Sequence, residues 1–220
     1  MRNLFSFYPT KKTVLKPVFL TLLIFLAGAF HYADAQIAFM AGGNISTIGN
    51  KIEIENKEPL VNTQIGFSLQ LYPLSKWQCI SILAEPNITR KGYRQSLDKT
   101  YSFEFNYLSL PVLVNYSLSE RISINSGLEF DNLFSTNIRH GMKTYNQFDM
   151  GLVAGINYHL FGRFSLYSRF AYGLVPLLDY YEIDELGNFK KEIHDLKNRC
   201  LTVGIKFNLS NEKIRLYKQL

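Results

Sequence analysis

QFDMGLVAGINYHLFGRFSLYSRFAYGL, from Gln147 to Leu174, predicts two long strands joined by a tight turn at residues 161–163. Apolar residues recur at every second position and share one face, while the other face is small or polar. Each arm has the length of about 10 residues that a tilted strand needs to cross a bilayer. The apolar face consists of Phe148, Met150, Leu152, Ala154, Ile156, Tyr158, Leu160, Phe164, Leu166, Phe170, Tyr172 and Leu174, with Ser168 as its polar member.

The first 35 residues have the pattern of a removable secretory signal. Three lysines precede an apolar run over residues 18–30, and Ala33-Asp34-Ala35 provides the small residues of a cleavage site. An uncleaved anchor is the alternative, although a span needs roughly 20 apolar residues. We therefore expect a signal over 1–35, a barrel domain over 36–210 and a short periplasmic tail over 211–220.

The charge of the chain does not indicate a nucleic-acid partner. The net charge of +6 includes four basic groups and one acidic group within residues 1–35, so the remainder carries only +3. Lysines scattered over that remainder form no basic run.

Cys79 and Cys200 are the only cysteines, and we expect no disulfide between them because the predicted strands put them at opposite ends of the molecule.

The same alternation recurs along the rest of the chain and predicts eight strands. Pro86 lies in the weakest of them, where its missing N–H group predicts a bulge or a local break in pairing. Two of the eight are the strands of the opening stretch, and the remaining six, including the one with Pro86 at 77–90, cover residues 36–46, 62–72, 77–90, 103–118, 121–130 and 199–209.

The predicted connections alternate between two classes. Short ones centre on Ser75, Ser119 and Gly162, and long ones cover 47–61, 91–102, 131–146 and 175–198. Short turns on one rim and long loops on the other are typical of an outer-membrane barrel, with the short turns in the periplasm. An even strand count puts both termini on the short-turn side.

Alternation alone also fits a soluble barrel with an apolar interior. Seven of the eight glycines in predicted strands lie on the polar face, and only Gly43 lies on the apolar one. A narrow eight-stranded barrel has little room inside, so this face is predicted to line the lumen. Aromatic residues near the strand ends are typical of interfacial belts. The predicted fold is an all-β, eight-stranded antiparallel up-and-down transmembrane β-barrel in the cell outer membrane.

Six segments resemble the small outer-membrane β-barrel family of Bacteroidetes that includes PorT-like proteins: AGGNIST (41–47), AEPNITRKGY (84–93), YLSLPVLVNY (107–116), FDMGLVAGINYHL (148–160), RFSLYSRFAYGL (163–174) and NRCLTVGIKFNL (198–209). The resemblance implies the barrel fold, and one branch of the family implies a loose association with gliding and protein secretion. Such barrels usually end on an aromatic residue, whereas here Phe207 is followed by a tail.

No catalytic or metal-binding motif is present in the sequence. His140, His159 and His194 lie at no ligand spacing, and no cysteine cluster accompanies them. The sequence also lacks a phosphate loop and a dinucleotide fingerprint. We expect no enzyme activity, no metal and no cofactor.

Four charged residues are predicted to face the lumen: Glu85, Glu129, Arg169 and Lys206. They could line a selective pore or form a structural network in a filled interior. The second interpretation is favoured because eight-stranded barrels are filled by side chains and enclosed charges must be paired. Glu85 and Arg169 are the expected pair, since their strands face each other across the lumen.

The longest predicted loop, 175–198, combines aromatic and charged residues. Its candidate contacts with a protein or glycan are Tyr180, Tyr181, Glu182, Lys190 and Lys191, although a solvated loop near lipopolysaccharide head groups is the alternative. We expect a monomeric structural or interaction protein, accessory to a secretion or envelope complex, with lipid, lipopolysaccharide and an envelope protein as partners. A narrow pore or small-ligand transporter is the alternative function.

Overall fold

The computed structural model describes residues 34–49, 56–72, 79–96, 98–138, 145–183 and 189–209, with side chains described outside 34–35, 179–183 and 189–195. Regular structure in these ranges is entirely β. The strands are β1 (Asp34–Gly49), β2 (Lys57–Tyr72), β3 (Ile80–Ala84), β4 (Asn87–Ser96), β5 (Thr100–Ser117), β6 (Ile122–Thr136), β7 (Phe148–Phe161), β8 (Phe164–Gly173), β9 (Leu178–Ile183), β10 (Phe189–Asp195) and β11 (Lys197–Asn208).

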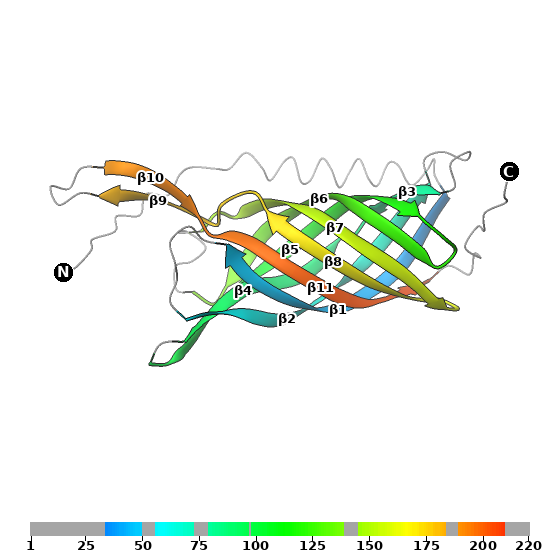
Figure 1. Ribbon diagram of the computed structural model, residues 1–220, viewed down its shortest axis with the longest axis horizontal. Helices are drawn as coiled ribbons and strands as arrows, with labels where there is room; N and C mark the ends of the chain where they lie inside the picture. Colours follow the sequence, from blue (N-terminus) through cyan, green and yellow to red (C-terminus); the bar gives the residue numbers. More distant parts are fainter. Residues whose placement is uncertain are drawn as a thin grey trace.

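Nine of these strands form one closed antiparallel barrel (Figure 1). The order is β1-β11-β8-β7-β6-β5, then β3 and β4 together, then β2, which pairs with β1 and closes the ring. Since β3 and β4 share one position between β2 and β5, the ring has eight positions. The predicted eight-stranded barrel is confirmed.

The interruption at Pro86 is confirmed as well. β3 ends at Ala84 and β4 begins at Asn87. Backbone pairing continues around the break, because Glu85 N donates to Pro111 O and Phe67 N donates to Pro86 O, both at 2.9 Å. The break therefore leaves the barrel wall closed and places the side chain of Glu85 in the lumen, where it is buried.

The predicted long connections are too long. β4 reaches Ser96 and β5 begins at Thr100, so 91–102 is mostly strand; β6 likewise continues to Thr136. Segment 175–198 contains the β9–β10 hairpin, which extends past one end of the barrel (Figure 1). The outward side chains are apolar only around the middle of the barrel and become polar toward the long-connection rim. The strands continue there because backbone N–H and C=O groups still form hydrogen bonds between strands.

The two faces of the barrel differ as predicted. Outward apolar side chains such as Val114, Leu152 and Val203 are exposed, whereas inward residues are buried. A Cβ atom on Gly42 would lie 2.7 Å from Tyr167 Oη, while one on Gly43 would meet nothing closer than 3.8 Å. Tyr167 is almost fully buried. The glycines on the polar face therefore provide space for lumen side chains.

Within the described part of the chain, no helix is long and apolar enough to span a membrane. The predicted signal over 1–35 lies outside the described residues apart from Asp34 and Ala35, and the predicted tail over 211–220 lies wholly outside them.

Candidate functional site

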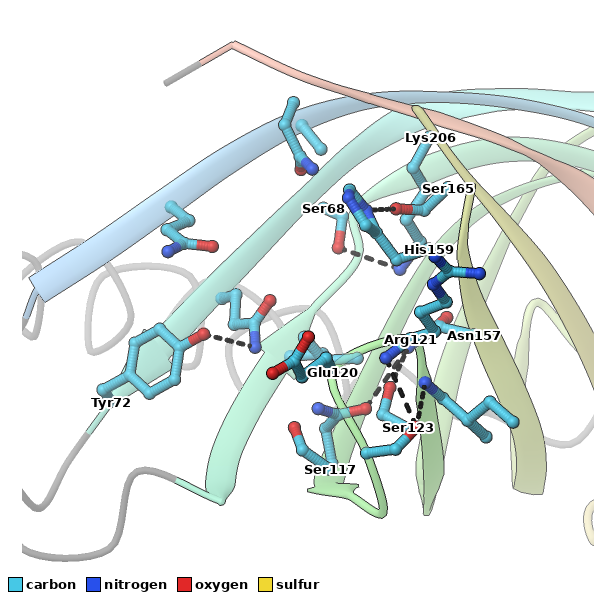
Figure 2. Close-up of a pocket in the computed structure, with 18 residues that line it drawn as sticks. Ser68, Tyr72, Ser117, Glu120, Arg121, Ser123, Asn157, His159, Ser165 and Lys206 are labelled. Carbon is cyan, nitrogen blue, oxygen red and sulfur yellow. Dashed lines mark hydrogen bonds between the residues drawn. The ribbon is translucent and has the colours of Figure 1, made fainter. Parts of the chain in front are cut away.

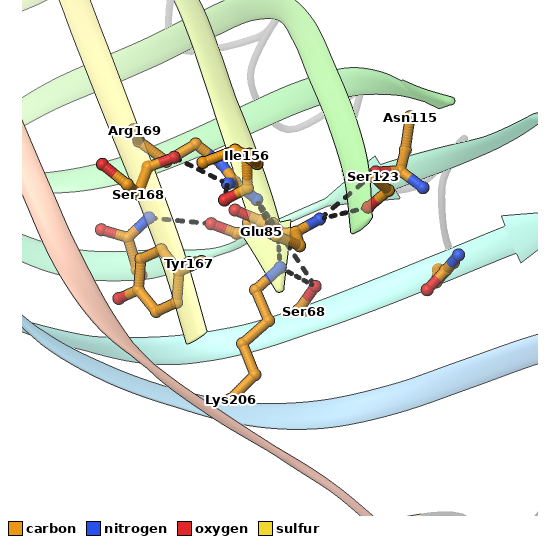
Figure 3. A network of polar contacts seen from close by, with 12 residues as sticks. Ser68, Glu85, Asn115, Ser123, Ile156, Tyr167, Ser168, Arg169 and Lys206 are labelled. Atoms are coloured by element: carbon orange, nitrogen blue, oxygen red, sulfur yellow. Dashed lines mark hydrogen bonds and ion pairs between the residues drawn. The ribbon is translucent and has the colours of Figure 1, made fainter. Parts of the chain in front are cut away.

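The lumen contains a first charge cluster centred on Glu85, at the break between β3 and β4 (Figure 3). Arg169 Nη2 on β8 lies 3.2 Å from Glu85 Oε1, and Lys206 on β11 forms an ion pair with the same oxygen. Ser68 Oγ donates to it at 3.1 Å, and Arg169 also donates to Asn157 Oδ1 at 2.8 Å. Three of the four predicted lumen charges thus meet in one contact.

Glu129, the fourth predicted residue, belongs to a second cluster. Lys91 Nζ on β4 lies 2.5 Å from Glu129 Oε1 and 2.5 Å from Asp131 Oδ2, both on β6. Ser109 Oγ also donates to Asp131. The predicted loops at 91–102 and 131–146 excluded Lys91 and Asp131 from the lumen. Asn87, Thr89 and Lys91 are every second residue of β4, so continuing the strand pattern past Asn87 would have predicted Lys91 as a lumen residue.

Tyr167 fills the lumen beside the first cluster. Its ring packs over the backbone at Gly42 and Gly204, two glycines paired across β1 and β11. Gln64 Nε2 donates to its hydroxyl at 2.9 Å. The Arg169 guanidinium carbon and Lys206 Nζ each lie 5.5 Å from the ring centroid, which adds a cation–π attraction.

An apolar group, the cap cluster, closes the end of the lumen at the long-connection rim. Phe105 packs edge-on against Tyr145 with ring centroids 5.0 Å apart, and Tyr93 stacks on Phe103 at 4.7 Å. Lys91 Nζ lies 5.6 Å from the Tyr107 ring, so the second charge cluster touches the cap cluster. The buried members of the cap cluster are Ile48, Tyr93, Phe105, Tyr107, Leu133 and Leu177.

The space between the two charge clusters is very small. A cavity of about 20 Å³ lies there, lined by residues of both clusters, including Glu85, Lys91, Glu129 and Arg169. A water molecule needs roughly 10–15 Å³ of such space, so the cavity holds about one. Among the residues that the structure describes, the lumen is therefore filled from the first cluster to the cap cluster.

A larger hollow, the vestibule, opens at the short-turn rim (Figure 2). Its volume is about 130 Å³ and its floor includes Lys206. His159 Nδ1 and Ser165 Oγ, on neighbouring strands of its wall, lie 3.2 Å apart. The vestibule is lined mainly by hydroxyl and amide groups, among them Ser68, Asn115, Ser117, Asn157 and Ser165.

The predicted loop contacts lie in the β9–β10 hairpin, and their side chains are outside the described part of the structure. Tyr180, Tyr181 and Glu182 belong to β9, and Lys190 and Lys191 belong to β10. In the hairpin register Lys191 is opposite Glu182. These residues are thus on a paired element and not on an irregular loop.

No group of three His, Cys, Asp or Glu side chains in the described ranges is arranged to hold a metal ion. His140 lies outside the described residues, as does the side chain of His194.

Comparison with protein families and known structures gives two kinds of match. Residues 21–179 match a family described as outer membrane protein beta-barrel domain. No curated protein matches the chain.

Three solved structures match the chain at low identity. Neisserial surface protein A is 10% identical with a TM-score of 0.46, covering 79% of this chain and 98% of that one. Ail of Yersinia pestis, solved with the heparin analogue sucrose octasulfate, is 12% identical with a TM-score of 0.45, covering 80% and 99%. OprG of Pseudomonas aeruginosa is 11% identical with a TM-score of 0.46, covering 80% and 96%.

Proposed function

The chain belongs to the outer membrane protein beta-barrel domain family and is located in the outer membrane; from this premise we propose that it acts there as a non-enzymatic structural or interaction protein. We further propose that it is a monomer whose contacts with partners are made at its rims, and that its lumen transports nothing.

The closed lumen is the observation that carries this proposal. Tyr167, the two charge clusters and the cap cluster occupy the interior, and the cavity between the clusters is only about 20 Å³. An eight-stranded barrel is just wide enough for side chains to fill. A narrow pore or small-ligand transporter, the alternative function, would need these side chains to move aside.

The long-connection rim is the proposed contact surface. The β9–β10 hairpin and the outer ends of β4 and β5 extend beyond the rest of the barrel there (Figure 1). We place this rim outside the cell, near lipopolysaccharide, and the short turns in the periplasm. The resemblance to PorT-like proteins supports an accessory role in a secretion or envelope complex, with Tyr180, Tyr181, Glu182, Lys190 and Lys191 as candidate contacts.

Conductance in planar bilayers tests the closed lumen. The purified protein should insert without producing stepwise currents. Stable current steps that grow with salt concentration would contradict the proposal and favour the narrow pore.

A variant in which a short turn replaces residues 178–195 tests the contact surface. Cross-linking in intact cells should lose the envelope partners of the wild-type protein, while the barrel still folds and inserts. An unchanged set of partners would show that the hairpin is not the contact surface.

A further inference from the structure

The vestibule differs from the rest of the lumen because its walls carry small side chains. Ala38, Ser117, Ser119, Ser123 and Ser165 line a space of about 130 Å³, against about 20 Å³ between the charge clusters. The barrel has the same number of strands at both levels, so the hollow results from side-chain size. Among the described residues, the first charge cluster seals its floor, and its opening lies at the short-turn rim.

The charges of the vestibule favour a neutral ligand. Lys206 at the floor is already paired with Glu85. Glu120 and Arg121 are consecutive residues of opposite charge at the mouth, where both are exposed. Arg169 gives the first cluster one more cation than anions, but both of its cations are buried and in contact with Glu85, so the vestibule presents neither of them as a free charge.

The walls also carry hydrogen-bonding side chains that make no hydrogen bond within the described part of the chain. The side chains of Gln36, Ser117 and Asn208 line the vestibule, are half-buried and make no hydrogen bond to another described residue. Gln36 on β1 and Asn208 on β11 lie on neighbouring strands. Ser117 on β5 lies on the opposite wall, because β5 and β11 are four positions apart in a ring of eight. A ligand in the mouth can therefore be held from two sides.

We propose that the vestibule binds the end of an uncharged saccharide chain that carries hydroxyl and acetamido groups. Such groups match the amides of Gln36 and Asn208 and the hydroxyl of Ser117, which both donate and accept hydrogen bonds. Tyr72, also on the wall, supplies an aromatic surface. A peptide fits less well, since the closed barrel has no free strand edge on which an extended backbone could pair.

The orientation in the proposed function places the vestibule in the periplasm, and the saccharide would reach it from that side. The binding test does not depend on orientation, because purified protein in nanodiscs exposes both rims. Failure to bind would overturn this inference alone, whereas conductance in bilayers would overturn the proposed function alone.

Titration calorimetry of the full chain in nanodiscs with triacetylchitotriose is the test. We expect saturable binding to the wild type and binding weakened about three- to tenfold in Ser117→Val and in Asn208→Leu, the loss expected for one hydrogen bond. Ser135→Val, near the other end of β6, is the matched control and should leave binding unchanged. A shift in gel mobility between unboiled and boiled samples checks that each variant is folded before boiling.

Three results would overturn the inference. The wild type could show no saturable binding, or folded Ser117→Val and Asn208→Leu could bind as well as the wild type. Saturable binding of a neutral acetylated dipeptide without any binding of the saccharide would assign the vestibule to peptides instead.

Discussion

Arg169 contributes several of the polar contacts inside the barrel. It donates to Glu85 at 3.2 Å, to Asn157 at 2.8 Å, and to the backbone carbonyls of Ile156 and Ser168 at 3.2 and 3.1 Å. Removing Arg169 leaves Glu85 with Lys206 alone and takes a donor from Asn157 Oδ1 and from the two carbonyl oxygens. We expect Arg169→Ala to lower the free energy of unfolding by about 3 kcal/mol, measured by denaturant titration in detergent.

The chain provides a matched control for this prediction. Arg90 pairs with Glu104 at 3.1 Å, but its side chain is 48% exposed. Surface pairs contribute about 0–1 kcal/mol, so Arg90→Ala should have a small effect. A double-mutant cycle that combines Arg169→Ala with Glu85→Ala should show a coupling energy between the two residues of about 1 kcal/mol or more. Additive losses would mean that the two residues act independently.

Lys91 and Lys206 differ in what remains when each is removed. Without Lys206, Glu85 still contacts Arg169, whereas Glu129 and Asp131 both depend on Lys91 among the described ion pairs. We expect Lys91→Met to cost about 3–5 kcal/mol and Lys206→Met to cost less, in the same unfolding assay. The reverse ranking would show that the first cluster, and not the second, carries more of the stability.

At the scale of single strands, Gly42 and Gly43 test which face of β1 points inward. A side chain at Gly42 would meet Tyr167 Oη and Val203 O at 2.7 Å, while one at Gly43 would meet only Asn62 O, at an ordinary contact distance of 3.8 Å. We expect Gly42→Val to destabilise the barrel by about 1–3 kcal/mol, as overpacking does, and Gly43→Val to change it by less than about 0.5 kcal/mol. The measurement is the temperature at which each variant unfolds, detected as a shift in its mobility on a gel. If Gly42→Val and Gly43→Val changed this temperature equally, the assigned faces of β1 would be wrong.

The strands show how far sequence patterns could predict the structure. Alternation identified all eight barrel positions and the break at Pro86, because the membrane forces one face to be apolar. Beyond the outward apolar side chains this constraint disappears, so the two faces no longer differ clearly in polarity at the ends of β4 and β6, and the sequence predicts loops there. Lys91 and Asp131 lie in those ends and are therefore absent from the predicted lumen charges, whereas Glu85, Arg169 and Lys206 lie where the alternation is clear. The β9–β10 hairpin was missed for the same reason.

For the whole molecule, the interior is a stack of layers. From the short-turn rim inward these are the vestibule, the first charge cluster with Tyr167, the cavity of about 20 Å³, the second charge cluster and the cap cluster. Each charged layer is paired internally, as burial requires. The central claim is that this stack closes the barrel and leaves function to the rims.

The two cysteines of the chain provide the most direct test of that claim. Cys200 is buried in the lumen at 4% exposure, packed with Leu83 and Val153, while Cys79 is only half-buried and lies at the short-turn rim. The measurement is the rate at which a water-soluble maleimide labels each thiol in the folded protein in nanodiscs, using Cys79→Ser and Cys200→Ser variants. A closed barrel predicts that Cys79 is labelled and that Cys200 reacts only after denaturation. Labelling of Cys200 in the folded barrel at a rate similar to that of Cys79 would show that water and solutes pass through the lumen.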